Sequence, residues 1–243
     1  MLPALLGAVL LGAPGAGESA PRVISNPVEP TVTAARYEEP TTRYTHGILG
    51  DDEEWGALVL EMSDGTARRI RLPQERVFED VAPRLADLDG DGAPEVIVVE
   101  TEVTLGAQLA VYGAEGKIAA TPHIGRSNRW LSPIGAADLD GDGHVEIAYV
   151  DRPHLAKIVM IWRYQHQALT RVAIREDFTN HRIGDAEIWG GIRQCGDQPP
   201  EMIVADAGWR NLHALRFDGQ KVTDRRLGPL KQTGDFKAAM TCP

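Results

Sequence analysis

Residues 86–100 read ADLDGDGAPEVIVVE, and residues 137–151 read ADLDGDGHVEIAYVD. The two segments lie 51 residues apart, and each joins an acidic, glycine-containing loop to a short apolar run. The runs over 96–99 and 147–150 are hydrophobic at consecutive positions, which is typical of strands that are buried on both faces. The repeated segment therefore predicts β-strands that are packed between neighbouring sheets.

The same period runs through four predicted hairpins. Each pairs two apolar runs across a short polar turn, and the turns align at Gly65, Gly116, Gln167 and Gly219, at intervals of 51, 51 and 52 residues. A period near 50 residues that holds about four strands is the signature of a radially repeated β structure. A β-sandwich, the competing all-β fold, does not account for this period. We therefore expect an all-β fold, a small β-propeller of about four, alternatively five, four-stranded blades.

The N-terminus predicts the compartment. Residues 2–11 read LPALLGAVLL and precede GAPGAGESA, which is typical of the hydrophobic part and the small-residue cleavage zone of a secretory signal peptide. No Lys or Arg precedes this run, so the frayed N-terminus of a cytosolic protein is the alternative. The run is too short to cross a bilayer, which takes about 20 apolar residues. We expect a signal peptide over 1–20 and a secreted or periplasmic protein.

The rest of the chain divides into a lead-in and one domain. Residues 21–42 contain four Pro and predict an extended lead-in, disordered in part, and the propeller is expected over 43–243. The first repeat lacks an inner strand, so we expect residues 236–240 to return as a strand that completes the first blade and closes the ring. Cys195 and Cys242 are expected to form a disulfide that fastens this strand, with two free thiols as the alternative.

The composition excludes several functions. Hydrophobic residues make up 43% and charged residues 25% of the 243 positions, which argues against wholesale disorder. The chain carries 35 acidic and 25 basic residues, for a formal net charge of −10. An acidic chain is a poor candidate for binding nucleic acid or anionic lipid, but it can bind cations.

The acidic loops predict calcium sites. Four carboxylates within nine residues repel one another unless a cation neutralises them, and Ca²⁺ takes about six to eight oxygen ligands. Gly92 and Gly143, at the sixth position of each loop, permit a sharp turn around an ion. We expect one Ca²⁺ in each loop, two sites in all, held by carboxylates and one backbone carbonyl: Asp87, Asp89, Asp91, Ala93 and Glu95 in the first, and Asp138, Asp140, Asp142, His144 and Glu146 in the second.

An EF-hand is the competing calcium motif, and the spacing argues against it. The twelfth position of an EF-hand carries a bidentate Glu, whereas Val98 and Tyr149 stand there in this chain. Mg²⁺ fits less well, because it prefers few carboxylates and several waters. An Asp/Gly turn that holds no ion is the remaining alternative.

Together with GAA at 135–137 before Asp138, the two loops resemble the calcium loops of FG-GAP/VCBS repeats, found in integrin-α-like β-propellers. The similarity is close over residues 83–99 and 134–151, and weaker across 43–230. Familiar members of this family have more blades than the length of this chain allows. The resemblance implies an extracytoplasmic, calcium-stabilised propeller that serves mostly in recognition.

A third copy of the acidic segment is degraded. It carries Arg193, Cys195 and Asp197 at the three Asp positions. We therefore do not extend the calcium role to this copy.

A second pattern recurs three times: a His shortly before a Gly, with a Trp five residues after that Gly. Equivalent positions in different blades lie around one ring, so these side chains could face a central opening. The functional interpretation is a His-lined metal or ligand site, or aromatic platforms for a sugar. The alternative is that Trp packs between blades and His caps a strand or turn. The candidate ligand-facing residues are His46, His123, His181, Trp55, Trp130 and Trp189.

Common catalytic motifs are missing from the sequence, which has no GxSxG, HExxH, P-loop or dinucleotide-binding motif. We therefore assign no catalytic residues and interpret the chain as an exported calcium-binding recognition or scaffold module with structural calcium. We expect a monomeric domain with a protein or glycan ligand, no nucleic acid partner and no membrane span. The alternative is an extracytoplasmic hydrolase or lyase with its site at the propeller axis.

Overall fold

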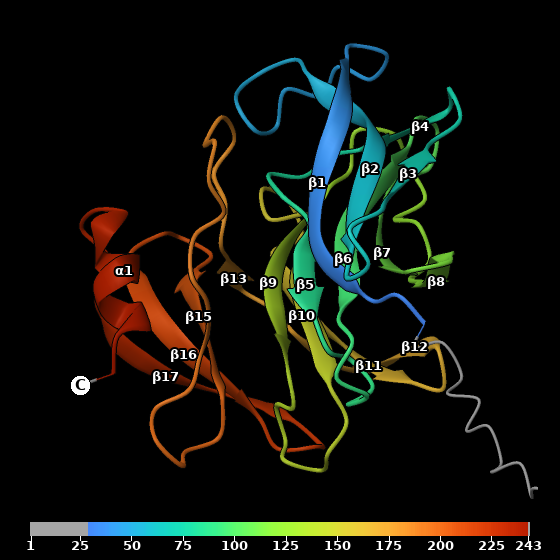
Figure 1. Ribbon diagram of the computed structural model, residues 1–243. Coiled ribbons are helices and arrows are strands. Elements are labelled where there is room, and N and C mark those ends of the chain that lie inside the picture. Colours follow the sequence, from blue (N-terminus) through green and yellow to red (C-terminus); the bar gives the residue numbers. More distant parts are fainter. Residues whose placement is uncertain (1–28, 243) are drawn as a thin grey trace, which may run out of the picture.

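The computed structural model describes residues 29–242. The signal peptide predicted over 1–20 lies outside these residues. The regular secondary structure of the described chain is β-strand apart from one short helix, and the strands form three antiparallel sheets (Figure 1). The all-β prediction is confirmed.

The first sheet holds eight strands. Its path runs β1–β2–β4–β6–β7–β8, with β3 paired to β2 and β5 paired to β6. The bounds are β1 (Val32–Thr41), β2 (Glu54–Met62), β3 (Ala67–Arg71), β4 (Arg76–Phe78), β5 (Arg84–Ala86), β6 (Glu95–Glu102), β7 (Gly106–Gly113) and β8 (Gly116–Ala120).

The other two sheets hold the rest of the strands. The second runs β12–β11–β10–β9, and the third runs β13–β15–β16–β17 with β14 paired to β15. The bounds are β9 (Leu131–Ala137), β10 (Glu146–Asp151), β11 (Ile158–Gln165), β12 (Ala168–Arg175), β13 (Phe178–Thr179), β14 (Gly191–Arg193), β15 (Glu201–Asp206), β16 (Asn211–Phe217) and β17 (Val222–Pro229).

All four predicted hairpins are present, as β2–β3, β7–β8, β11–β12 and β16–β17. Two further strands precede each of the last three hairpins, so β5–β8, β9–β12 and β14–β17 form four-stranded units. The first unit holds β1, β2 and β3, and lacks the innermost strand as the sequence predicts. We refer to these as the first to fourth units in chain order.

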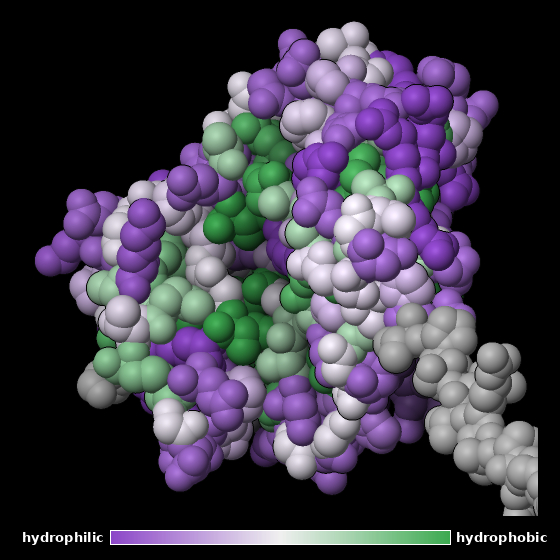
Figure 2. Space-filling model, in the orientation of Figure 1, coloured by the Kyte–Doolittle hydropathy of each residue, from purple (hydrophilic) through white to green (hydrophobic). Residues whose placement is uncertain are grey.

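The units pack face to face through strands that are buried on both sides. In β6, Val96 and Val98 enter the core shared with the first unit, whereas Ile97 and Val99 enter the core shared with the third unit. Strands β10 and β15 divide their side chains between two cores in the same way. Because successive side chains of a strand point to opposite faces, each of these strands joins two cores. Polar residues cover most of the face in Figure 2, and hydrophobic residues border the hollow near its middle.

Strand β1 lies in the region expected to be an extended lead-in. It is extended, but it is also paired with β2 along its length, from Val32 opposite Met62 to Thr41 opposite Glu54. Val32 is 2% exposed and belongs to the core between the first and second units. This part of the lead-in therefore contributes to the folded core.

The C-terminal segment differs from the prediction. Residues 236–240, expected to form a closing strand, lie in helix α1 (Gly234–Met240), which contacts β14 and β15 of the fourth unit. The run KAAM at its end consists of good helix formers, and the helix has no β-branched residue. Phe236 is 1% exposed and packs against Trp189 and Trp209. The segment therefore covers the fourth unit and does not complete the first.

The predicted disulfide is present. Cys195 and Cys242 are bonded, with their Cα atoms 5.5 Å apart. The bond joins the loop after β14 to the chain just beyond α1, so it fastens a helix where a strand was expected. Helix α1, the one helix within residues 29–242, does not have the length and hydrophobicity that a membrane crossing requires.

Candidate functional site

The first acidic loop joins β5 to β6 and is folded by its own carboxylates. Asp87 accepts the backbone N–H groups of Gly90 and Gly92, one on each oxygen, at 2.8 and 3.0 Å. Gly90 and Gly92 have φ angles of 79° and 88°, in the left-handed region that favours glycine. The tight turn predicted from the position of Gly92 is therefore present.

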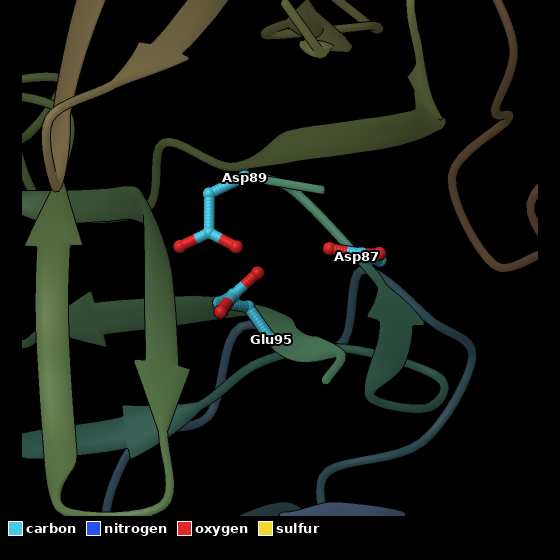
Figure 3. Close-up of side chains that lie close together, drawn as sticks. All are labelled: Asp87, Asp89 and Glu95. Atoms are coloured by element: carbon cyan, nitrogen blue, oxygen red, sulfur yellow. The ribbon is translucent and has the colours of Figure 1, made fainter. Parts of the chain in front are cut away.

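Three of the predicted ligands of this loop come together (Figure 3). One carboxylate oxygen from each of Asp87, Asp89 and Glu95 lies within 4.8 Å of the others. Glu95 is 8% exposed, and its Oε2 accepts the N–H of Leu88 at 2.9 Å. Burial, and then the charges of Asp89 and Asp91, raise the pKa of Glu95. A cation in the loop would relieve this repulsion.

A buried hydroxyl from the neighbouring unit lies beside the first loop. Tyr164, on β11, is 2% exposed, and its hydroxyl has no hydrogen-bond partner among the described residues. It lines a pocket of about 470 Å³ together with Asp89, Asp91 and Glu95. Burial and these three acidic neighbours raise the pKa of Tyr164 to about 12. A bound ion, or water on that ion, would supply the missing partner.

The second acidic loop, between β9 and β10, repeats this geometry. Asp138 accepts the N–H groups of Gly141 and Gly143 at 2.7 and 2.9 Å, and Glu146 accepts the N–H of Leu139 at 2.9 Å. These bonds match those of the first loop one for one. Three carboxylates again bring one oxygen each within 4.8 Å of the others: Asp138, Asp140 and Glu146.

The other predicted ligands lie in the same loops but outside these three-residue clusters. Asp91 accepts the N–H of Ala93 at 2.7 Å, and Asp142 accepts the N–H of His144 at 3.0 Å. The imidazole of His144 contacts Gln165 rather than the acidic cluster. Both aspartates are exposed. The second oxygen of Asp91 can turn toward an ion without loss of packing, whereas that of Asp142 pairs with Arg163 at 2.8 Å.

The second loop differs from the first in one basic side chain. Arg163, on β11, forms ion pairs with Asp140, Asp142 and Glu146, with N···O distances of 2.6, 2.8 and 2.6 Å. Its guanidinium group supplies positive charge in the place where an ion would. Within residues 29–242, the carboxylates of the first loop form no such ion pair.

In the third, degraded copy of the acidic segment, arginine side chains replace the cation more completely than in the second loop. Glu201 opens β15 as Glu95 opens β6, and it pairs with three guanidinium groups. The partners are Arg193, Arg216 and Arg225, at 2.7, 2.8 and 3.0 Å. Burial acts to raise the pKa of Glu201, but these guanidinium groups lower it. In this copy the arginine side chains therefore neutralise Glu201, and no metal ion is needed to balance its charge.

The three recurring histidines contact different groups. His123 Nδ1 lies 2.7 Å from the backbone carbonyl oxygen of Gly106. His46 Nδ1 lies 2.5 Å from a carboxylate oxygen of Glu79. His181 Nε2 lies 2.8 Å from the backbone carbonyl oxygen of Asp185. The structure therefore does not bring all three imidazoles together.

The three recurring tryptophans pack in separate cores. Trp55 stacks near Tyr37 in the core between the first and second units. Trp130 is buried in the core between the second and third units. Trp189 stacks near Phe236 of α1. Their positions in the described chain are those of packing residues.

Two residues near His46 and His181 were missed by the sequence analysis. Glu79 is fully buried beside His46, and His154 Nε2 lies 3.0 Å from Nδ1 of His181. Burial, and then the charges of His181 and His46, lower the pKa of His154 to about 4. His154 follows no repeat spacing; the signal available for Glu79 was its place directly after the apolar pair at 77–78.

Residues 87–149 match the family model described as an FG-GAP-like repeat. This stretch carries an FG-GAP-like repeat. The predicted resemblance to FG-GAP/VCBS repeats is thereby confirmed, and the FG-GAP-like stretch spans both acidic loops. No curated protein matches the chain.

Proposed function

We propose that the chain is an exported, calcium-binding β-propeller-type module in which calcium is structural and which serves recognition or scaffolding. The first acidic loop carries this proposal. Its three clustered carboxylates lie beside a buried hydroxyl that lacks a partner among the described residues, that of Tyr164. The FG-GAP-like repeat over 87–149 supports the same assignment.

The donor atoms favour calcium over other cations. The first loop offers carboxylate and carbonyl oxygens and no nitrogen or sulfur, which suits a hard cation. Four acidic side chains within nine residues suit Ca²⁺ better than Mg²⁺, which keeps several of its waters. Asp91 and the carbonyl of Ala93 would complete the ligand set around the cluster.

The two loops are expected to differ in affinity. An ion can enter the first loop without displacing a basic side chain, because no Lys, Arg or His within residues 29–242 pairs with the carboxylates of that loop. In the second loop it must displace Arg163, which holds two charge-assisted hydrogen bonds, to Asp140 and Glu146, and a further ion pair with Asp142. We therefore expect the first loop to fill at a lower calcium concentration than the second.

Bound calcium would act through stability and position. Each loop joins the innermost strand of a unit to the next strand, which lies between two cores. An ion that binds only the folded state stabilises it by about 2.7 kcal/mol at a concentration 100 times its Kd. The Cys195–Cys242 bond fits an oxidising, extracytoplasmic compartment. Stable units of this kind would present their connecting loops to a protein or glycan.

Calorimetry tests this function. The purified chain is melted with excess calcium and with chelator, and its metal content is measured after dialysis. We expect calcium to raise the Tm, and Asp89→Asn to remove most of that rise. Asp89 suits this test because its carboxylate accepts one long hydrogen bond within the loop, from the N–H of Asp91 at 3.3 Å, so the substitution disturbs the fold of the loop little.

Glu176→Gln is the matched control, because Glu176 is an exposed acid outside both loops. It should leave the calcium response unchanged. If neither calcium nor chelator changes the Tm, and the dialysed chain holds no bound metal, the calcium assignment is refuted.

A further inference from the structure

Loops from three units meet at a second pocket, away from the acidic loops. Its volume is about 260 Å³. The N–H of Gly184, in the β13–β14 loop, donates to the carbonyl of Ile48, in the loop before β2, at 3.1 Å. This bond ties the first unit to the fourth beside the pocket. The lining includes His46, Ile48, Trp130, His154, Leu155 and Ile183.

One nitrogen of His46 is fixed by a buried carboxylate. Glu79 is 0% exposed, and its two oxygens are held by Nδ1 of His46 at 2.5 Å and by the hydroxyl of Thr101 at 2.6 Å. With Nδ1–H donating to this carboxylate, the lone pair of the imidazole lies on Nε2. Nε2 of His46 has no hydrogen-bond partner within residues 29–242, and the ring lines the pocket.

The tautomer of His154 follows from a chain of hydrogen bonds. A backbone carbonyl can only accept, so Nε2 of His181 donates to the carbonyl of Asp185 at 2.8 Å. Nδ1 of neutral His181 therefore accepts, and Nε2–H of His154 donates to it at 3.0 Å. This leaves the lone pair of His154 on Nδ1, an atom without a partner in the described chain.

We propose that Nε2 of His46 and Nδ1 of His154 bind a transition-metal ion of the Zn²⁺ class at this pocket. Metal-binding histidines characteristically donate their other N–H to a carboxylate, a backbone carbonyl or a water, which orients the lone pair. Glu79 does this for His46, and the relay from His181 to Asp185 does it for His154. Imidazole nitrogens suit Zn²⁺ and Cu²⁺, whereas Ca²⁺ takes oxygen ligands, so this site is chemically separate from the acidic loops.

The surroundings hold the ligands in place and leave room on the metal. The ring of His154 lies parallel to Trp130, with an interplanar angle of 7° and centroids 6.3 Å apart. Leu155 and Ile183 are 63% and 70% exposed and give the pocket an apolar rim. Two protein nitrogens leave the other coordination positions to water or to a bound anion. Arg129 and Arg152 also line the pocket, and the charge of Arg152 is offset by Asp151 at 2.7 Å.

Calorimetric titration with Zn²⁺ tests the proposal, on the whole exported chain with saturating calcium so that the acidic loops are filled. One Zn²⁺ per chain is expected. His46→Ala and His154→Ala should each weaken Zn²⁺ binding roughly tenfold or more, and Glu79→Gln, which alters only the group behind His46, by roughly 10- to 100-fold. Nitrogen hyperfine couplings in the electron paramagnetic resonance spectrum of the Cu²⁺-loaded chain should report two imidazoles, and one in either His→Ala variant.

His166→Asn is the matched control. His166 is an exposed turn residue with a φ of 51°, a conformation that Asn adopts readily, and the variant should keep wild-type Zn²⁺ affinity. Circular dichroism shows which variants fold; His154→Gln replaces His154→Ala if the smaller side chain unfolds the pocket. Absence of Zn²⁺ binding, or unchanged affinity in the folded variants of both histidines, overturns the proposal. Binding of inorganic phosphate in the absence of Zn²⁺ would also overturn it and assign the pocket to an anion. Neither outcome depends on the calcium response of the acidic loops.

Discussion

Gly219 packs directly on Asp140: a Cβ added to Gly219 would lie 2.9 Å from Oδ2 of Asp140. Gly219 belongs to the hairpin turn of the fourth unit, and Asp140 belongs to the second acidic loop, in the third unit. The aligned turn residue of the third unit, Gln167, lines the pocket beside Asp89 of the first loop. A hairpin turn of one unit thus lies against the acidic loop of the preceding unit, so the loops are part of the contact between units.

Replacing Gly219 by Ala should destabilise the protein and disturb the second loop. Gly219 has a φ of 84°, which costs an L-residue about 1–2 kcal/mol, and the new methyl group would also meet Asp140. We expect the free energy of unfolding in urea to fall by about 1–3 kcal/mol more than in Gly65→Ala. Gly65 is the matched control, because its φ is 82° and a Cβ there meets nothing within 4 Å. Equal losses in the two variants would contradict the contact.

Removing Arg163 should turn the second loop into a stronger calcium site. In Arg163→Met the carboxylates of Asp140, Asp142 and Glu146 lose their internal cation, so the calcium-free protein should be less stable and its second loop should bind Ca²⁺ roughly tenfold or more tightly. Calcium titration calorimetry measures this as a second site that appears at lower concentration. Arg171→Met, an exposed arginine on the next strand, should leave the isotherm unchanged. If Arg163→Met binds calcium as the wild type does, Arg163 does not compete with the ion.

The repeat explains which parts of this picture the sequence could predict. The loop around Gly92 and the buried strands follow from local residue patterns that recur every 51 residues, and both are present in the structure. The pairing of Arg163 with Glu146 depends instead on the register between β10 and β11, which places the two residues opposite each other. This register cannot be predicted from the spacing of residues along a single strand. The difference between the two loops was therefore beyond the sequence pattern.

The C-terminal disulfide should contribute strongly to stability. The bond between Cys195 and Cys242 spans 47 residues, and restricting a loop of that size in the unfolded chain is worth about 4 kcal/mol in the chain-entropy model. We expect Cys195→Ser/Cys242→Ser to lower the Tm markedly and to increase hydrogen exchange in α1. Reduction of the wild type should have the same effect. A Tm that is unchanged by reduction would show that the contacts of Phe236 hold α1 without the bond.

The parts that the sequence analysis missed depend on contacts between distant segments. The run at 236–240 is apolar enough for a strand, but its helix formers and the burial of Phe236 against two tryptophans favour a helix. The pairing of His154 with His181 joins two loops 27 residues apart that share no repeat position. Such pairs are fixed by how the units stack, which a single sequence does not display.

Glu54 should make stability depend on pH in a direction opposite to that of a paired carboxylate. It opens β2, is 3% exposed, and burial followed by the charges of Glu79, Asp51 and Asp80 raises its pKa from 4.5 to about 9. The folded state therefore keeps a proton that the unfolded chain releases above about pH 4.5, so the contribution of Glu54 to stability falls as the pH rises from there to about 9. Glu54→Gln removes this loss and should raise the free energy of unfolding by about 1–3 kcal/mol near pH 8, with little change near pH 4. Urea unfolding at the two pH values measures the difference, with the exposed neighbour Glu53→Gln as the control. A gain of equal size at both pH values would mean that Glu54 is ionised alike in the folded and unfolded states.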